Sequence, residues 1–302
     1  MQILKSVLDF DKNLCPAVAV GTFDGIHSGH KRVLESAVLS GHFPVALVIN
    51  RKKDENSPSA ITTKKRRDEL MESLGIKCIL DIDLEDIYFL SPAEFVDDFL
   101  KKGLGAVSVF CGFNFKYGKN AAGDTTLLKK LCEQNGIELC VASPENYEGA
   151  PISSTRIRTA IEEGKVHDAA KMLSRYFSFD FPVLQGDKIG RTLDMPTINQ
   201  VFPKGFILPK VGVYAVNVSI EGKNYKGVCN IGPRPTIDRT EFRAETNIIG
   251  FSGNLYGKRP RVSLVEYIRE TKKFPSLLAL REEVARNIDY TEKLQFEGDL
   301  IG

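Results

Sequence analysis

The spacing of apolar residues changes near residue 175, and this change limits the folds that the chain can adopt. Before it, short apolar runs such as 17–20, 44–49 and 107–111 alternate with segments of helical periodicity. This alternation predicts a parallel sheet with helices on both faces. After it, the run 211–220 is rich in β-branched residues and alternates with a period of two over its second half. Short antiparallel strands without intervening helices predict a small barrel.

The two patterns predict two domains, 1–178 and 179–302, because a domain usually contains about 100–200 residues. The α/β domain has further predicted strands at 78–81 and 139–142, and helices at 33–38, 63–74, 92–100 and 127–134. The second domain has further predicted strands at 225–231, 245–251 and 261–268. Ser276 is predicted to cap a final helix with Leu277, Leu280, Val284 and Ile288 on one face.

The charge balance and the cysteine spacing argue against several classes of protein. With 41 basic and 39 acidic residues, the chain has no broad field that would steer it to nucleic acid or an anionic membrane. No apolar run approaches the ~20 residues of a membrane span, and residues 1–13 lack the apolar stretch of a signal peptide, so we expect a cytoplasmic protein. The six cysteines form no CxxC pair. Most lie in apolar runs, where we expect reduced core residues.

The segment 21–30, GTFDGIHSGH, lies at a predicted junction between a strand and a helix. It places His27 and His30 on either side of Gly29. A helix N-terminus offers unpaired amide hydrogens and a partial positive charge, and Gly25 and Gly29 let the backbone approach a ligand closely. The segment therefore indicates a phosphate site, against the alternative that the histidines are ordinary satisfied polar groups.

A second polar segment, 151–158, reads PISSTRIR. Ser153 or Ser154 can cap the helix that runs to Gly164, and Arg158 falls one turn into that helix. An ordinary capped helix would look the same. Hydroxyls, free amides and a guanidinium at one helix start would equally hold a triphosphate, and a second phosphate-site segment on the same predicted sheet favours this function.

The segment 110–118, FCGFNFKYG, surrounds Asn114 with three phenylalanines and a tyrosine after a predicted strand. Such side chains can stack on a flat heteroaromatic ring while the asparagine hydrogen-bonds its edge. Packing in the core would account for the aromatic residues equally well.

In the second half, a glycine-bounded basic loop, 186–192, precedes Pro196-Thr197-Ile198-Asn199. The loop is not a Walker A motif, since GxxxxGK[ST] occurs nowhere in the chain. Its amides could wrap phosphates, and Thr197 and Asn199 offer neutral oxygens to a Mg²⁺ ion that keeps most of its waters. A β-turn before a proline is the alternative. Glu245, in a predicted strand, is either solvent-facing or a general base for a hydroxyl that attacks a γ-phosphate.

Together these segments resemble the bifunctional bacterial riboflavin kinase/FMN adenylyltransferase family, the prokaryotic FAD synthetases. The segments that occur in the family's order are GTFDGIHSGH, GFNFKYGKNAAGD, ISSTRIR, GDKIGRTLDMPTIN, GVYAV, GVCNIGPRPT, LYGK and KFPSLLAL. The resemblance implies a Rossmann-like nucleotidyltransferase domain followed by a riboflavin-kinase barrel with a C-terminal helix. It also implies an enzyme that converts riboflavin and ATP into FMN and ADP, and then FMN and ATP into FAD and pyrophosphate.

The resemblance implies roles for individual residues. His27 and His30 would stabilise the α-phosphate of ATP while the FMN phosphate attacks it, and Arg158 would act on the triphosphate. Asn114 would contact the flavin, and Glu245 would activate the ribityl hydroxyl of riboflavin. The implied nucleotide contacts are Gly21, Thr22, Phe23, Gly29, Ser153, Ser154, Thr155, Gly186, Gly190 and Thr192. Thr197 and Asn199 would bind Mg²⁺ with ATP. Only small-molecule partners are implied, and we expect a monomer or a weak homo-oligomer.

The chain departs from the family's usual residues at several positions. An apolar-Pro-His-Pro stretch is replaced by Val48-Ile49-Asn50-Arg51-Lys52, a glycine by Asp194, an alanine by Ile198 and a histidine by Asn247. Two alternatives therefore stay open, namely an enzyme with one activity and a flavin-binding regulatory protein without turnover. The presence of His27, His30, Arg158 and Glu245 favours turnover, because binding alone needs none of these groups.

Overall fold

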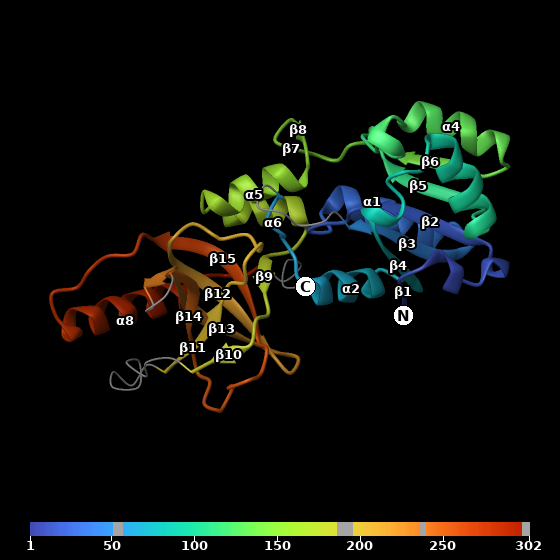
Figure 1. Ribbon diagram of the computed structural model, residues 1–302. Coiled ribbons are helices and arrows are strands. Elements are labelled where there is room, and N and C mark those ends of the chain that lie inside the picture. The colour runs from blue at the N-terminus through green and yellow to red at the C-terminus, as the bar shows by residue number, and fades with distance from the viewer. Residues whose placement is uncertain (51–56, 186–195, 236–239, 298–302) are drawn as a thin grey trace. The chain divides into compact units, whose positions relative to one another are not determined.

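The computed structural model describes residues 1–50, 57–185, 196–235 and 240–297. Contacts divide the chain into two compact units (Figure 1). Unit 1 comprises Met1–Pro58 and Lys64–Ser153, and unit 2 comprises Ser59–Thr63 and Ser154–Gly302. The short segment Ser59–Thr63 belongs to unit 2 because Ala60 exchanges backbone hydrogen bonds of 2.8 and 2.9 Å with Gly205 and Ile207.

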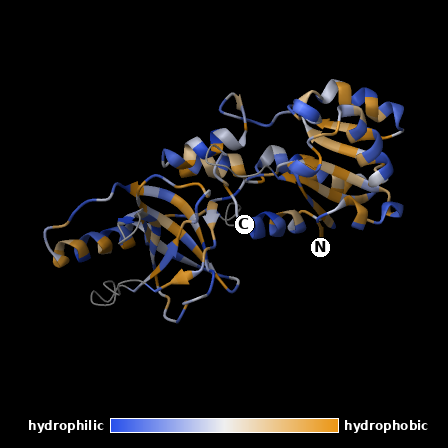
Figure 2. Ribbon diagram, viewed as in Figure 1, coloured by the Kyte–Doolittle hydropathy of each residue, from blue (hydrophilic) through white to orange (hydrophobic). Residues whose placement is uncertain are grey.

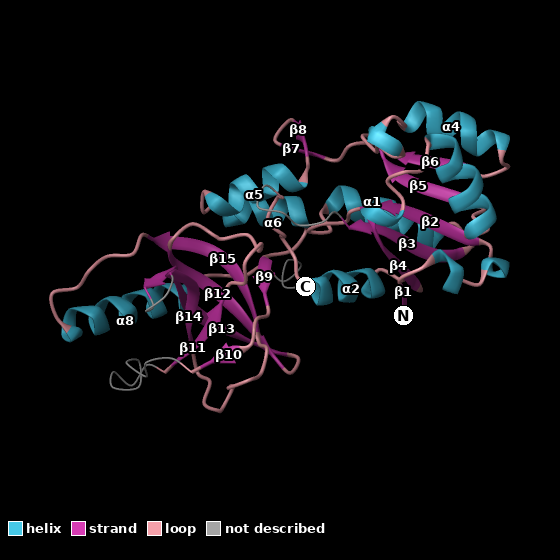
Figure 3. Cartoon of the chain, viewed as in Figure 1, coloured by secondary structure: helices cyan, strands magenta, loops and turns pink. Residues whose placement is uncertain are grey.

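Unit 1 is built on a six-stranded parallel sheet with the strand order β1-β4-β3-β2-β5-β6 (Figure 3). Its strands are β1 (Gln2–Leu4), β2 (Pro16–Gly21), β3 (Phe43–Asn50), β4 (Cys78–Asp83), β5 (Ser108–Gly112) and β6 (Glu138–Ala142). The longer helices are α1 (Ser28–Leu39), α2 (Lys64–Ser73), η4 (Phe95–Gly103, a π-helix preceded by α3, Pro92–Glu94) and α4 (Thr125–Gln134). Short 3₁₀ turns are η1 (Val7–Asp9), η2 (Lys12–Leu14), η3 (Leu84–Asp86) and η5 (Lys119–Ala121), and β7 (Asn146–Tyr147) pairs with β8 (Ala150–Pro151). The predicted α/β fold is confirmed.

Both faces of the parallel sheet are buried, which explains the apolar runs in its strands. In β2, Val18 and Val20 face a core that includes residues of η4 and α4, whereas Ala17 and Ala19 face a core with residues of α1 and α2. Figure 2 shows these strands as mainly hydrophobic. The small side chains on the second face let α1 pack closely on β2.

The order of strands in unit 1 reverses next to β2. The chain passes from β2 to β3 and β4 on one side, and then returns to β5 on the other side of β2. Ligands of open α/β sheets bind at the carboxyl ends of the strands where the order reverses. The segments that follow β2 and β5, 21–30 and 112–118, therefore share the edge at which a ligand site is expected.

Asp81, near the carboxyl end of β4, is a buried carboxylate that is bound by several cations. Lys5 and Lys64 donate to its Oδ2 atom, and Arg67 Nη2 lies 2.9 Å from its Oδ1 atom. Asn50, at the end of β3, donates to the same Oδ1 atom at 3.0 Å. Burial alone would raise the pKa of Asp81, but the hydrogen bonds from Lys5, Lys64 and Asn50 and the Arg67 charge together lower this pKa well below its ordinary value.

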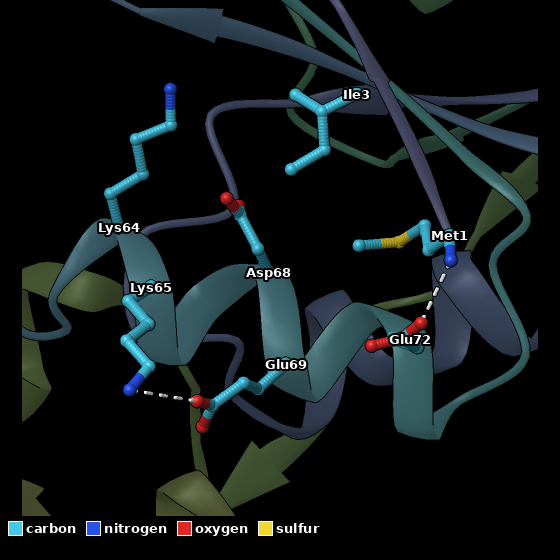
Figure 4. A pocket seen from close by; sticks show the side chains of 7 residues that line it. All are labelled: Met1, Ile3, Lys64, Lys65, Asp68, Glu69 and Glu72. Atoms are coloured by element: carbon cyan, nitrogen blue, oxygen red, sulfur yellow. Dashed lines mark hydrogen bonds and ion pairs between the residues drawn. The ribbon is translucent and has the colours of Figure 1, made fainter.

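A shallow groove of about 490 Å³ lies beside this cluster (Figure 4). Its lining residues are Met1, Ile3, Lys64, Lys65, Asp68, Glu69 and Glu72. The charges in the groove are paired: the Met1 amino group lies 2.9 Å from Glu72, Lys65 lies 3.8 Å from Glu69, and Arg67 lies 3.1 Å from Asp68. We therefore assign no ligand to it.

Unit 2 contains a seven-stranded antiparallel sheet with the order β10-β11-β14-β13-β12-β15-β9. Its strands are β9 (Phe177–Phe179), β10 (Val183–Leu184), β11 (Thr197–Val201), β12 (Gly212–Ile220), β13 (Lys223–Pro235), β14 (Thr240–Ile248) and β15 (Arg261–Arg269). The two edge strands, β9 and β10, are separated by only residues 180–182 in the chain. The sheet must therefore curl until its edges approach each other, and it forms a half-barrel, in agreement with the predicted barrel class.

Phenylalanine rings fill the interior of the half-barrel. Phe179 lies 4.9 Å from Phe202, and Phe181 lies 5.0 Å from Phe206, between ring centroids. All four side chains are buried. Buried aromatic pairs stabilise a fold by more than the burial of their surface alone, so this cluster stabilises the curled sheet.

Among its described residues, unit 2 also contains the helices α5 (Ser154–Glu162), α6 (Val166–Leu173) and α8 (Leu277–Lys293). The predicted cap of the last helix is confirmed, since Ser276 accepts a hydrogen bond from the Ala279 amide at 3.2 Å. The grouping of α5 and α6 with the sheet follows from contacts. The sequence predicted a boundary between two functional domains at residues 178 and 179, and this boundary stays a prediction.

The predicted apolar face of α8 is not its most buried face. Leu277 is exposed, and Leu280, Val284 and Ile288 are half-buried. The buried positions are Glu283, Asn287 and Thr291. Local periodicity could not show this, because the burial depends on partners from elsewhere in the chain.

Those partners are the cations Arg269 and Lys272, which surround Glu283 together with Arg286 of α8 itself. Its carboxylate is paired with Arg286 and Lys272, and with Arg269 at 3.0 Å. The hydrogen bonds from Arg286 and Lys272 lower the pKa of Glu283 to about 2.

Among the described residues, none of the helices is both long and apolar enough to span a membrane.

We expect four of the six cysteines to be protected from thiol reagents. Cys78, Cys111, Cys132 and Cys229 are buried, while Cys15 and Cys140 are exposed. Burial raises the thiol pKa of Cys78 and Cys132 to about 11, and that of Cys111 and Cys229 to about 12, so little reactive thiolate forms. An aromatic disulfide reagent at mildly alkaline pH should modify two thiols in the native protein and six after denaturation. Rapid modification of more than two would contradict the packing described above.

The Asp81→Asn substitution should destabilise unit 1 by about 3–5 kcal/mol near neutral pH, because it removes a buried carboxylate from the buried Arg67 guanidinium and from the exposed Lys5 and Lys64. Since the folded-state pKa of Asp81 is lowered, its contribution is present above the unfolded-state pKa of about 3.9 and is lost as pH falls toward the folded value. Denaturant unfolding of both proteins should therefore show a difference that shrinks below about pH 4. A difference that is constant with pH would argue against a charged Asp81.

Candidate active sites

The first candidate site is formed by the turn between β2 and α1. His27 is the N-cap of α1, and its Nδ1 atom accepts a hydrogen bond from the His30 amide at 3.3 Å. The two imidazole rings stack with centroids 3.7 Å apart, and His27 is only 7% exposed. The structure thus brings both predicted histidines together at the start of a helix, where the helix dipole favours an anion.

The backbone of this turn is strained. Phe23 and Ile26 have φ angles of +50° and +38°, a region that L-residues rarely adopt, whereas Gly25 has a φ of +82° that glycine adopts without strain. A Cβ atom at Gly29 would lie 3.3 Å from two atoms of the His27 ring. The glycine therefore allows His27 to lie flat against the first turn of the helix.

The neighbouring predicted contacts differ in their exposure. Thr22 is exposed, whereas Phe23 is buried and its ring contacts that of His30 edge-on at 5.4 Å. A Cβ atom at Gly21 would lie 3.2 Å from the Phe23 ring. Any contact of Phe23 with a nucleotide would therefore use its main chain.

At the end of β5, the aromatic residues divide into two groups. Phe110 and Tyr117 belong to the cores on the two faces of the sheet, so packing accounts for them. Phe113 is 43% exposed, and Asn114 is exposed as well. Phe115 is half-buried and stacks on Tyr117 with ring centroids 5.7 Å apart. Phe113, beside Asn114, is thus the most exposed of the predicted stacking residues.

The predicted triphosphate contacts lie at the start of α5. Ser154, Thr155 and Arg158 belong to this helix, and Ser153 precedes it directly. Arg158 Nε donates to the Ser59 carbonyl at 2.7 Å. His27 and His30 belong to unit 1, whereas α5 belongs to unit 2, so the meeting of the two segments at one nucleotide stays a prediction.

The second candidate site lies on the sheet of unit 2. In the antiparallel register, Asn199 of β11 is directly opposite Glu245 of β14, and Thr197 is opposite Asn247. Side chains alternate along strands, and directly opposite residues have Cβ atoms about 4.5–5.5 Å apart on one face. The structure therefore brings three predicted site residues, Thr197, Asn199 and Glu245, together on one face of the sheet.

Polar contacts tie this face together. Glu245 Oε1 accepts a hydrogen bond from Arg234 of β13, and Asn247 Nδ2 donates to the Pro196 carbonyl at 3.1 Å. Asn199 is 8% exposed, and among the described residues its Oδ1 atom has no hydrogen-bond partner. A buried oxygen of this kind is suited to a ligand that supplies the missing partner.

Some predicted residues cannot be placed. Gly186, Gly190 and Thr192 lie outside the described residues, as do the departures Arg51, Lys52 and Asp194. Within the described ranges, no group of three or more histidine, cysteine, aspartate or glutamate side chains could hold a metal ion.

Comparison with known proteins gives two family matches. The model of the riboflavin kinase family matches residues 173–295, and that of the FAD synthetase family matches residues 11–156. The riboflavin kinase/FMN adenylyltransferase of Bacillus subtilis (strain 168) is 31% identical over 300 residues, covering 94% of this chain and 93% of that protein. The chain belongs to the bifunctional riboflavin kinase/FMN adenylyltransferase family. The resemblance seen in the sequence motifs is confirmed.

Other members of the bifunctional riboflavin kinase/FMN adenylyltransferase family show the same full-length similarity. The relative from Buchnera aphidicola subsp. Schizaphis graminum (strain Sg) is 30% identical over 308 residues, covering 97% of this chain and 98% of that protein. A crystal structure titled macrolide-efflux protein, from Streptococcus pneumoniae, has 27% identity and a TM-score of 0.86, covering 97% of this chain and 99% of that one. The fold is thus shared over nearly the whole chain.

Sequence reasoning missed Arg234, which contacts Glu245. The strand predicted at 225–231 ends before it, whereas β13 continues to Pro235. The signal was present in the segment GVCNIGPRPT, but a basic residue between prolines reads as a loop. Only the pairing of β13 with β14 shows that it reaches a site residue.

Proposed function

We propose that this chain phosphorylates riboflavin with ATP to give FMN and ADP, and then adenylylates FMN with a second ATP to give FAD and pyrophosphate. The observation that carries this proposal is that each family match covers its own sheet. The riboflavin kinase match includes β9 to β15, and the FAD synthetase match includes β2 to β6. The functional boundary is proposed at residues 178 and 179, within the edge strand β9.

In the proposed kinase step, Glu245 is the general base. Its carboxylate accepts the proton of the terminal ribityl hydroxyl, whose oxygen forms a bond to the γ-phosphorus of ATP. The bond from that phosphorus to the bridging oxygen breaks, and ADP leaves with the electron pair. The half-buried position of Glu245 on the polar face, opposite Asn199, supports this role.

Thr197 and Asn199 are proposed to hold Mg²⁺ together with the phosphates of ATP. The Asn199 Oδ1 atom, which is buried and has no partner in the described part of the chain, fits a cation that prefers oxygen ligands. Thr197 adds a hydroxyl two residues away on the same face. When bound, the ion would neutralise charge that develops on the phosphates. Gly186, Gly190 and Thr192, outside the described residues, are proposed to contact the phosphates of the same ATP.

In the proposed adenylyl transfer, His27 and His30 stabilise charge on the α-phosphate at the N-terminus of α1. An oxygen of the FMN phosphate bonds to the α-phosphorus, and the bond to the bridging oxygen of pyrophosphate breaks. No covalent enzyme intermediate is needed, so catalysis consists of positioning and charge stabilisation. Asn114 is proposed to bind the flavin, and Gly21, Thr22, Phe23 and Gly29 the nucleotide. Ser153, Ser154, Thr155 and Arg158 are proposed to hold the leaving pyrophosphate.

The unmutated protein, incubated with riboflavin and Mg-ATP, should form FMN, FAD, ADP and pyrophosphate, which chromatography resolves. Formation of FMN alone, or of FAD only from supplied FMN, would favour an enzyme with one activity. Binding of flavin without conversion would favour a regulatory protein, and it would reject the proposed function.

The His30→Ala substitution should lower FAD formation from supplied FMN by about 100-fold or more, because it removes charge stabilisation at the α-phosphate. FMN formation from riboflavin should stay unchanged. Both rates can be measured on one preparation, so the kinase rate serves as the folding control. Unchanged FAD formation would reject the assignment of segment 21–30 to adenylyl transfer.

The Glu245→Gln substitution should have the opposite effect. Glutamine keeps the size and hydrogen bonding of the side chain but cannot accept the proton, so FMN formation should fall by about 100-fold or more. FAD formation from supplied FMN should continue at the unmutated rate. Retention of riboflavin phosphorylation would show that another group is the base.

A further inference from the structure

We propose that Arg234 is a positioning residue for the phosphorylation of riboflavin, an inference that rests on the proposed kinase function. Arg234 Nη1 donates to Glu245 Oε1, from the neighbouring strand β13, and each side chain is 31% exposed. The guanidinium fixes the carboxylate so that its other oxygen can receive the proton of the substrate hydroxyl.

The strand register shows that Arg234 pairs with a glutamate that is not directly opposite it. The residue directly opposite Arg234 is Glu241, while Glu245 lies four positions farther along β14. Arg234 therefore extends past Gly232, its neighbour on the same face of β13. A Cβ atom at Gly232 would have only Val211 within 4 Å, at 3.5 Å. The missing side chain at this position leaves the path along the face open.

A second arginine on the same face makes a different contact. Arg243 is directly opposite Gly232. It donates through Nε and Nη2 to Glu241, at 3.1 and 2.7 Å. The two arginines therefore differ in what they orient, since Arg243 is paired with Glu241 and Arg234 with Glu245. Arg243 supplies a matched control within the same sheet.

The contact leaves one oxygen of Glu245 available. Among the described residues, the carboxylate of Glu245 accepts its hydrogen bond from Arg234, and this bond goes to the Oε1 atom. The Oε2 atom can then face the substrate hydroxyl. Holding the side chain in one rotamer before the substrate arrives removes an entropic cost from the reaction. The positive charge also offsets the repulsion between this carboxylate and the phosphates of ATP.

The test compares Arg234→Gln, Arg234→Lys and the control Arg243→Gln by steady-state formation of FMN. For Arg234→Gln, kcat should fall between about 10- and 100-fold, while KM for riboflavin and for ATP stays within about threefold. Arg234→Lys should recover part of the lost kcat, because it keeps the charge. Arg243→Gln should keep kcat within about threefold.

A double-mutant cycle separates action through Glu245 from a general effect. In the Glu245→Gln protein, adding Arg234→Gln should change the residual kcat by less than about twofold, because the group that Arg234 positions is already inactive. An equal fall in both backgrounds would overturn the proposal. So would a kcat of Arg234→Gln within about threefold of the unmutated value, or a rise in KM for ATP without a fall in kcat.

Two controls keep the outcomes distinct. Quenching of riboflavin fluorescence and thermal unfolding show whether unit 2 of Arg234→Gln is folded; if it is not, Arg234→Lys carries the comparison of kcat and KM. An unmutated protein that forms no FMN would reject the kinase function itself. FMN formation that is insensitive to Arg234 would reject only the positioning role.

Discussion

Hydrogen bonds between β11 and β14 hold Asn199 opposite Glu245 and Thr197 opposite Asn247, and the proposed kinase site depends on this register. Side chains alternate between the two faces of a strand. A shift by one residue would turn Glu245 toward the interior, where Ala244 and Thr246 are now fully buried. The burial of that inner row therefore keeps the polar row on the opposite face. The separate pairing of β13 with β14 brings Arg234 within reach of Glu245.

Unit 1 positions its candidate site by different means. The parallel pairing of β2 with β5 brings the ends of two strands to one edge, and small residues on one face of β2 let α1 pack closely. The helix start then lies at the place where the strand order reverses. Away from the sites, Asp81 and Glu283 each bind several cations from separate elements. These ion pairs fasten a strand to a helix in each unit, and they involve none of the proposed catalytic groups.

Strong local patterns predicted much of the fold. The apolar runs of β2, β3, β4 and β5 were visible because both faces of the sheet are buried, and the cap at Ser276 follows from local hydrogen bonding. By contrast, β1 has three residues and no apolar run, so it escapes prediction. The strand β11 contains Thr197, Asn199 and Gln200, a polar composition typical of a turn, and only its pairing with β14 makes it a strand.

From the sequence alone one can determine the two fold classes, the family and the residue types of both sites, since these depend on local periodicity and on motifs in a fixed order. The tertiary structure decided which of those residues are buried, which are exposed and which are paired with one another. It placed Phe110 and Tyr117 in the core and left Phe113 exposed, buried Glu283 in α8, and paired Arg234 with Glu245. The physical reason is that burial and charge pairing depend on contacts between segments far apart in the chain, which no local pattern encodes.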